Sequence, residues 1–225
     1  MKTIILIPYR DREEHLKYFL ENTAPLLNEK IENLEILIIE QSEDGKRFNR
    51  GKILNVGFDY YNEDEYYYIT QDVDTNPIEN TFDYYKMKIN NDSVLSITSP
   101  HKICLGGIIK MNGKTFRRIN GFRNDIWGWG LEDRDFYYRC INKKIGIKRI
   151  NKKKVRFNFL QHDRPITIHS KLNKNIRKRT KLIFKSRNIE LKENYIMESG
   201  LNNLKYDILE EIVLNSYIKK IIVEI

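Results

Sequence analysis

Residues 65–74 read Glu-Tyr-Tyr-Tyr-Ile-Thr-Gln-Asp-Val-Asp, and this stretch decides the fold. Its aromatic and β-branched part, 65–70, predicts a buried strand that ends just before Asp72 and Asp74. In an open α/β sheet, ligands bind at the carboxyl ends of the strands. Two carboxylates one residue apart at such an end can approach one hard divalent cation, or divide the work between a cation and sugar hydroxyls. The alternative is an ordinary Asp-rich turn that binds no metal.

Outward from this strand, short apolar runs alternate with segments of helical period. An N-cap at Asp11, with Glu14 completing a capping box, predicts the start of the first helix. We predict further elements as follows: strands over 3–7, 34–39 and 93–98, and a helix over about 48–61. This alternation indicates an α/β fold with a Rossmann-like, mostly parallel central sheet flanked by helices.

The second half of the chain contains shorter elements. We predict helices over 114–120 and from Leu131, strands over 147–150 and 155–160, a basic loop or helix, a closing helix near 206–214 and a last strand over 217–223. We find no repeat and no low-complexity linker, so residues 1–225 are expected to form a single domain.

The composition describes a folded, basic chain. It has 225 residues, 40% of them hydrophobic, and 40 Lys and Arg against 31 Asp and Glu, so the net charge is +9. We expect Cys104 and Cys140 to be separate buried thiols, as suits a reducing compartment. No apolar run approaches the roughly 20 residues of a membrane-spanning helix, and no signal peptide is recognised. These features predict a soluble cytoplasmic protein.

The positive charge is concentrated in two clusters, over 143–154 and 171–185. The simplest interpretation is a solvated basic face that attracts any anion. A dedicated site for nucleic acid is not expected. Attraction to a polyanion or to an anionic membrane surface is the alternative.

Both tryptophans of the chain lie in one glycine-punctuated loop, and two carboxylates follow them. Trp127-Gly128-Trp129-Gly130 leads through Leu131 into Glu132 and Asp133, in the first turn of a predicted helix. Carboxylates at that position complement the helix dipole. They also suit a general base beside a tryptophan wall that stacks on sugar rings and excludes water.

Three further groups are candidates for a site. Arg10 and Arg12, directly after the first strand, suit phosphates or a uracil ring, or else are charges at a helix start. Phe48 and Arg50 have the same two interpretations at the next helix start. His162, at the end of the 155–160 strand, is either a ligand or a structural hydrogen-bonding group.

In order along the chain, these elements resemble the beta-1,4-galactosyltransferase family, glycosyltransferase family 7. The Leu131-Glu132-Asp133 form, with His162-Asp163 downstream, is most similar to the branch that adds galactose to xylose in proteoglycan linkers. The resemblance spans almost the whole chain and is carried by these segments: Ile5–Leu16, Phe48–Phe58, Asp72-Val73-Asp74, Gly106-Gly107, Asn120–Asn124, Trp127–Asp133 and Gly200–Tyr206.

The resemblance implies a GT-A fold and a role for each matching residue. Around the nucleotide it places Pro8, Arg10, Arg12, Phe48, Arg50 and Gly107, with Asp72 facing the nucleotide sugar. It implies Mn²⁺ or another divalent cation on Asp74 and His162. Trp129 would lie where donor and acceptor meet, Glu132 would hold sugar hydroxyls, and Asp133 would be the catalytic base.

Three positions depart from the family pattern. Arg134 replaces a second carboxylate that contacts the acceptor, so the acceptor could be acidic. Phe159 and Leu160 stand where a further metal ligand is expected. Cys104 replaces a tyrosine that crowds an N-acetyl group, so UDP-GalNAc is an alternative donor to UDP-galactose.

We therefore expect a metal-dependent, inverting glycosyltransferase that moves galactose or N-acetylgalactosamine from UDP to a sugar hydroxyl of a glycan. Peripheral contact with a membrane is a further expectation from the basic clusters. The alternative is a non-catalytic basic module, on a degenerate glycosyltransferase fold, that binds polyanions or anionic membrane surfaces.

Overall fold

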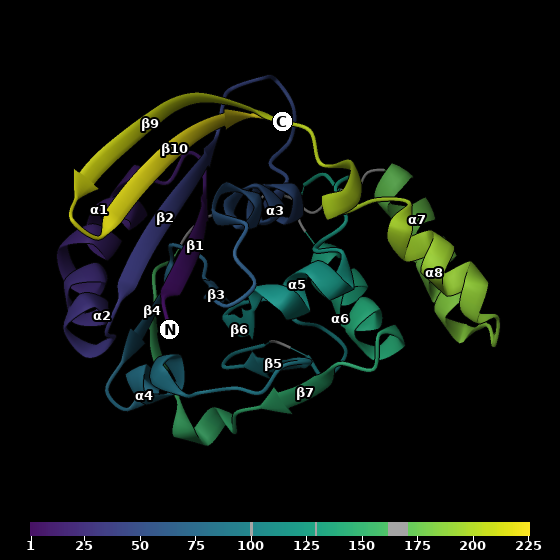
Figure 1. Ribbon diagram of the computed structural model, residues 1–225. Helices are drawn as coiled ribbons and strands as arrows, with labels where there is room; N and C mark the ends of the chain where they lie inside the picture. The colour runs from purple at the N-terminus through teal and green to yellow at the C-terminus, as the bar shows by residue number, and fades with distance from the viewer. Residues whose placement is uncertain (100, 129, 162–170) are drawn as a thin grey trace.

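A mixed sheet of eight strands forms the centre of the computed structural model, which describes residues 1–99, 101–128, 130–161 and 171–225 (Figure 1). The strand order is β7-β5-β6-β3-β1-β2-β10-β9. The strands are β1 (Thr3–Tyr9), β2 (Leu34–Gln41), β3 (Tyr67–Thr70), β5 (Ser93–Ser96), β6 (Ile109–Asn112), β7 (Gly146–Arg149), β9 (Asp207–Asn215) and β10 (Ile218–Glu224). A second, two-stranded antiparallel sheet pairs β4 (Thr75–Ile78) with β8 (Arg156–Phe159).

Parallel pairing dominates the middle of the large sheet. Strand β1 pairs in parallel with both β2 and β3, and β2 pairs in parallel with β10. Strand β6 runs antiparallel to β3 and β5. The predicted α/β fold with a mostly parallel central sheet is therefore confirmed.

Helices cover both faces of this sheet because successive side chains of a strand point to opposite faces. Ile4 and Leu6 of β1 pack in a core with α3 (Arg50–Tyr61), α5 (Gly113–Ile119) and α6 (Glu132–Asn142). Ile5 and Ile7 pack in a second core on the other face. That core includes residues of a π-helical turn and two helices: Phe19–Thr23, α2 (Ala24–Lys30) and α4 (Thr81–Lys86). Helix α1 (Glu13–Tyr18) precedes the π-helical turn.

Two helices form a hairpin that projects from the edge of the molecule, α7 (Lys171–Lys185) and α8 (Ile189–Met197) (Figure 1). They contact each other, and α7 also contacts α6. Single 3₁₀ turns lie at Lys152–Lys154 and Leu201–Asn203. Among the residues that the structure describes, no helix combines the length and apolar character needed to cross a bilayer.

Two predictions about local structure were wrong. Residues 206–214, expected as a closing helix, form β9, which is stabilised by antiparallel pairing with β10 rather than by a helical apolar face. The first helix is capped at Arg12 without a side-chain hydrogen bond, so the capping box of Asp11 and Glu14 does not form. Asp11 has φ of 51°, which is not an N-cap conformation, and its carboxylate faces Arg10 Nε at 3.6 Å. The prediction for Cys104 and Cys140 is confirmed, because both are free and buried.

Candidate active site

The carboxyl ends of β1 and β3 lie side by side and carry most of the predicted site residues. The two strands pair in parallel up to Leu6 and Thr70. Beyond that point β1 continues through Pro8 and ends just before Arg10, and the chain after β3 leads to Asp72 and Asp74. Parallel pairing therefore brings together residues more than 60 positions apart in the sequence, as the strand-end argument predicted.

Arg50 joins three segments of this edge. Its Nε donates to Asp72 Oδ1 at 2.7 Å, and its Nη2 lies 3.4 Å from the carbonyl oxygen of Gly107. Its Nη1 lies 4.0 Å from Glu132 Oε1. Asn49 caps α3 by accepting from Lys52 N, which sets Arg50 in the first turn of that helix. Arg50 thus links the end of β3 to the first turn of α6.

Gly51, in the first turn of α3, packs closely against Phe122, which precedes α6 in the chain. A Cβ at Gly51 would lie 3.1 Å from Phe122 Cβ and 3.5 Å from Glu132 Cβ. The first of these distances is shorter than ordinary van der Waals contact, so a side chain at residue 51 would collide with Phe122, whereas Glu132 would lie at ordinary contact distance. Glycine at residue 51 therefore lets the segment that carries Phe122 pack closely on the first turn of α3.

Glu132 and Arg50 each have a buried polar atom without a partner. Within the described ranges, neither Glu132 Oε2 nor Arg50 Nη1 has a hydrogen-bond partner. Burial, assisted by the neighbouring Asp133, raises the pKa of Glu132 to about 7. Burial alone would lower the pKa of Arg50, but Asp72 and Glu132 reverse this and raise it. An unsatisfied acceptor beside an unsatisfied donor suits a sugar hydroxyl, which can donate to one and accept from the other.

Asp133 is half-buried and lies against a second glycine. A Cβ at Gly106 would lie 3.2 Å from both Cβ and Oδ2 of Asp133. The Asp133 carbonyl accepts a hydrogen bond from Leu105 N at 3.0 Å. Burial and the nearby Asp133 carboxylate raise the pKa of the Cys104 thiol. Cys104 therefore contacts the candidate base, Asp133. From the sequence, Cys104 was expected only near the donor sugar.

Asp74 lies where β4 begins. Its Oδ1 accepts from Thr75 Oγ1 at 3.1 Å, and its carbonyl accepts from Leu160 N at 3.0 Å, which extends the β4–β8 pairing. A half-buried carboxylate at a strand end provides the oxygen ligand that a hard cation prefers. The other predicted ligand, His162, lies outside the described residues. Among those described, no three His, Cys, Asp or Glu side chains lie close enough together to hold a metal ion.

The remaining nucleotide-binding candidates lie on the β1 side of the edge. The Arg10 guanidinium lies 5.7 Å from the centre of the Phe48 ring, and its Nη1 donates to the carbonyl of Lys46 at 3.0 Å. Arg12 is the N-cap residue of α1. Pro8 is in β1, opposite Ile39 of β2. Arg10 and Phe48 together present a cationic group and an aromatic face.

The loop of residues 127–130, which we call the tryptophan loop, packs beside Lys46 and Phe48 on the β1 side of the site. Gly128 N donates to the carbonyl of Phe48 at 2.8 Å, and Lys46 Nζ lies 5.9 Å from the Trp127 ring. Gly128 and Gly130 have φ of 79° and 85°, values that favour glycine, so the loop depends on both. Trp129, between them, lies outside the described residues.

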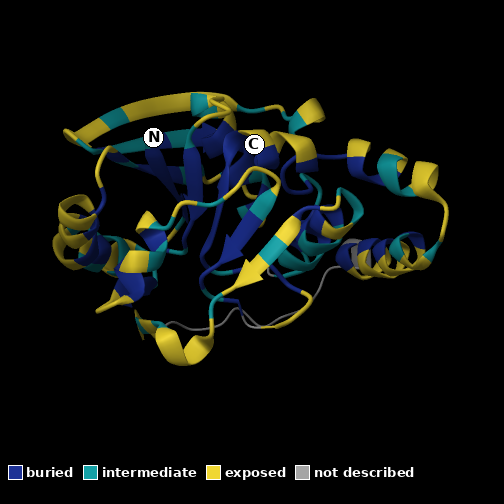
Figure 2. Ribbon diagram, turned by 60° about the horizontal axis from the view of Figure 1, so that its bottom comes forward, coloured by how far each residue is buried: buried dark blue, intermediate teal, exposed yellow. Residues whose placement is uncertain are grey.

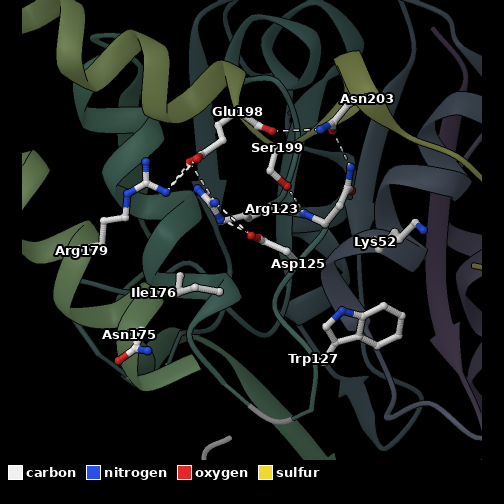
Figure 3. A pocket seen from close by; sticks show the side chains of 11 residues that line it. Lys52, Arg123, Asp125, Trp127, Asn175, Ile176, Arg179, Glu198, Ser199 and Asn203 are labelled. Carbon is white, nitrogen blue, oxygen red and sulfur yellow. Dashed lines mark hydrogen bonds and ion pairs between the residues drawn. The ribbon is translucent and has the colours of Figure 1, made fainter. Parts of the chain in front are cut away.

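A cavity of about 600 Å³ lies on the side of Trp127 that faces α7 and α8 (Figure 3). At its wall, Arg123 bonds Asp125 at 2.6 and 3.0 Å and Glu198 at 3.1 Å. Arg179 of α7 bonds the same Glu198 at 2.8 Å. This network could not be predicted from the sequence, because Glu198 is 75 residues from Arg123 and no local spacing connects them. The network attaches the helical hairpin to the loop that carries Trp127.

Two family models together match residues 1–163. Residues 1–88 match the N-terminal region of glycosyl transferase group 7, and residues 87–163 match the N-terminal domain of galactosyltransferase. Mouse beta-1,4-galactosyltransferase 1 is 34% identical over 171 residues, or 72% of this chain and 42% of the mouse protein. The xylosylprotein 4-beta-galactosyltransferase of Caenorhabditis elegans is 34% identical over 163 residues, or 67% of this chain and 54% of the worm protein. The chain therefore spans about half the length of these curated relatives.

Solved structures agree with this assignment. The catalytic domain of Drosophila beta-1,4-galactosyltransferase 7, in complex with xylobiose, superimposes with a TM-score of 0.77 at 26% identity, covering 99% of this chain and 93% of that domain. A mutant of the fly protein superimposes with a TM-score of 0.74 at 23% identity, again over 99% of this chain and 93% of that one, and supports the fold. The motifs, the two matched regions and the shared fold agree, and the chain belongs to glycosyltransferase family 7, the beta-1,4-galactosyltransferases.

Proposed function

We propose that this chain is the catalytic domain of a metal-dependent, inverting glycosyltransferase. It transfers galactose or N-acetylgalactosamine from a UDP donor to a hydroxyl group of a glycan. The observation that carries the proposal is the cluster of Arg50, Asp72 and Glu132 beside Asp133, with an unsatisfied buried donor and acceptor at its centre. A donor sugar would satisfy both atoms through its hydroxyls.

In this proposal Asp133 is the general base. It takes the proton from the acceptor hydroxyl while that oxygen attacks the anomeric carbon of the donor. The new carbon–oxygen bond forms on the face opposite the bond to UDP, which breaks with its electron pair, so the configuration inverts. Glu132 and Asp72 hold donor hydroxyls, and Arg50 holds Asp72 by a hydrogen bond and attracts Glu132 electrostatically.

The nucleotide is assigned to the β1 side of the site. Phe48 provides a face for the uracil ring, while Arg10 and Arg12 provide positive charge for the diphosphate. Pro8 and Gly107 line the pocket in this proposal. Asp74 and His162 would hold Mn²⁺, which would neutralise charge on the departing diphosphate. Trp129 would pack against the sugars at the point of transfer.

The ligands of related structures and two residues of this chain support the choice of substrates. The fly protein was solved with xylobiose, and its mutant with manganese, UDP-Gal and xylobiose. In this chain, Cys104 lies beside Asp133 and is smaller than a tyrosine, and in this proposal the smaller side chain accommodates an N-acetyl group. Arg134 follows the proposed base and would favour an acceptor that carries a carboxylate or phosphate group.

The test measures UDP release and sugar transfer from UDP-Gal and UDP-GalNAc, with and without Mn²⁺, on a panel of neutral and acidic saccharides. Asp133→Asn should lower transfer by at least about 100-fold while UDP affinity changes by only a few-fold. Glu190→Gln is the matched control, because Glu190 is also a first-turn carboxylate but lies on α8. Absence of metal-dependent turnover with any UDP-sugar would refute the proposal, and retained activity in Asp133→Asn would remove Asp133 as the base. If the protein does not bind UDP at all, the result would favour the alternative function, a non-catalytic binding module.

A further inference from the structure

Helix α7 has an unusual charge distribution along its length. Residues 171–185 contain seven Lys and Arg and no Asp or Glu. A solvated helix face commonly mixes charges of both signs, because opposite charges three or four residues apart stabilise a helix and like charges destabilise it. The all-basic composition therefore works against the helix in isolation.

Four of these basic residues form one line along the exposed side of α7. Lys174, Lys178, Lys181 and Lys185 follow the i, i+4, i+7, i+11 spacing of a single helix face, and all four are exposed. We call these four residues the lysine stripe. Among the described residues, no ion pair or hydrogen bond involves any of their side chains. The opposite face, Asn173, Ile176, Thr180 and Ile183, is buried against the protein.

Two large aliphatic side chains toward the end of the hairpin are exposed, one on α7 and one at the start of α8. Leu182, between Lys178 and Lys185 on the same face, is 71% exposed. Ile189, just after the turn into α8, is 72% exposed. Figure 2 shows α7 with its buried side toward the body, and the mostly exposed turn between the helices at the far end of the hairpin. The surface thus combines aligned cations with aliphatic groups that water solvates poorly.

The hairpin is held firmly to the candidate active site. Asn173 Nδ2 donates to the carbonyl of Trp127 at 2.7 Å, in the tryptophan loop. Tyr195 of α8 donates to Asp135 of α6 at 2.9 Å, inside the protein. Asp135 belongs to the same helix turn as Glu132, so whatever the hairpin binds is fixed in position relative to the site.

We propose that the lysine stripe, with Leu182 and Ile189, docks this protein on an anionic membrane surface. Basic side chains along one helix face are attracted to acidic lipid headgroups, and adjacent aliphatic side chains enter the boundary between headgroups and acyl chains. A nucleic-acid backbone would attract the lysines equally well but offers no apolar layer for Leu182 and Ile189. Docking does not depend on the proposed sugar transfer, and it places the candidate site beside the bilayer.

The experiment measures co-sedimentation of the full chain with vesicles at physiological ionic strength. One set is pure phosphatidylcholine, and in the other about a third of the lipid is phosphatidylglycerol. We expect partition into the anionic vesicles to be at least about ten-fold stronger. Each basic side chain near such a surface contributes roughly five-fold. The triple variant K178E/K181E/K185E should therefore lose most of the binding.

The chain offers a matched control of equal charge change. K152E/K153E/K154E reverses three exposed lysines in a different element and should reduce partition far less. L182S/I189S should lower partition by roughly ten-fold, and the remaining binding should be more sensitive to salt. If the glutamate variant does not fold, K178Q/K181Q/K185Q provides the same comparison without introducing carboxylates.

Three outcomes would overturn the proposal. The first is equal partition into neutral and anionic vesicles. The second is an equal loss in the two triple lysine-to-glutamate variants, which would indicate attraction by net charge alone. The third is unchanged partition in L182S/I189S together with binding to single-stranded DNA that depends on the lysine stripe, which would favour nucleic acid. UDP-sugar turnover, measured in parallel without vesicles, is expected to be unchanged in every variant and reports separately on the proposed enzyme.

Discussion

The raised pKa of Glu132 predicts that Glu132→Gln changes how the stability of this protein depends on pH. Burial and Asp133 raise this pKa from 4.5 to about 7. Between these two values the native protein binds more protons than the unfolded chain, so the free energy of unfolding falls as pH rises through the window. A shift of this size corresponds to about 3 kcal/mol over the whole window. Glutamine does not ionise, so the variant should lack this loss.

The assay is urea unfolding of the wild type and of Glu132→Gln at several pH values from about 5 to about 8. We expect the wild type to lose about 2 to 3 kcal/mol relative to the variant across this range. Comparing the two proteins at each pH removes the contributions of those titrating groups that do not interact with Glu132. It also removes any constant effect of taking a carboxylate away from Arg50, which keeps its 2.7 Å hydrogen bond to Asp72.

Glu198→Gln is the control for this experiment. Burial would raise the pKa of Glu198, but hydrogen bonds from Arg179 and Arg123 outweigh burial and lower it below 4.5. The stability contributed by Glu198 is therefore lost only at lower pH. Above about pH 5, the free energy of unfolding of Glu198→Gln should change with pH in the same way as that of the wild type. If the profile of Glu132→Gln is also parallel, Glu132 is ionised throughout, and our account of an unsatisfied buried carboxylate is wrong.

Three further predictions concern other residues. Asp74→Asn should weaken Mn²⁺ binding by at least about ten-fold in a calorimetric titration with UDP present, and unchanged affinity would remove Asp74 from the metal site. Cys104→Tyr should shift the ratio of kcat/KM values toward UDP-Gal over UDP-GalNAc, and an unchanged ratio would count against contact between residue 104 and the donor sugar. Burial lowers the pKa of Lys110 to about 8, so the native protein binds fewer protons than the unfolded chain between about pH 8 and 10.5. In the wild type the free energy of unfolding should therefore rise over that window, and in Lys110→Met this rise should be absent. Equal slopes of unfolding free energy against pH in the two proteins would contradict the prediction.

The sequence predicted the central sheet well because its signal is local. Buried parallel strands are continuous apolar runs, and 3–7, 34–39 and 65–70 all lie within or beside observed strands. The prediction for 206–214 was wrong because its apolar residues also suit a helix. Ile208, Leu209, Ile212 and Val213 recur at helical spacing, and only pairing with β10 decides the strand.

The candidate site was predictable to the extent that strand ends define it. Asp72 follows β3 and Arg10 follows β1, so their shared edge follows from parallel pairing. The link from Arg50 to Glu132 spans 82 residues, and no spacing in the sequence indicates it. The link becomes visible only when α3 and α6 are both placed in the structure.

The unsatisfied atoms of this site connect its stability to its proposed chemistry. A buried carboxylate with one unsatisfied oxygen destabilises the folded protein, and the guanidinium 4.0 Å from its other oxygen offsets only part of that cost. A sugar hydroxyl that donates to Glu132 Oε2 would favour the ionised carboxylate and lower its pKa. An analogue that lacks this hydroxyl would leave both buried atoms unsatisfied, and such a mismatch is penalised far more than the loss of one apolar contact. The same arrangement that weakens the free protein near neutral pH would therefore make it selective for the correct donor.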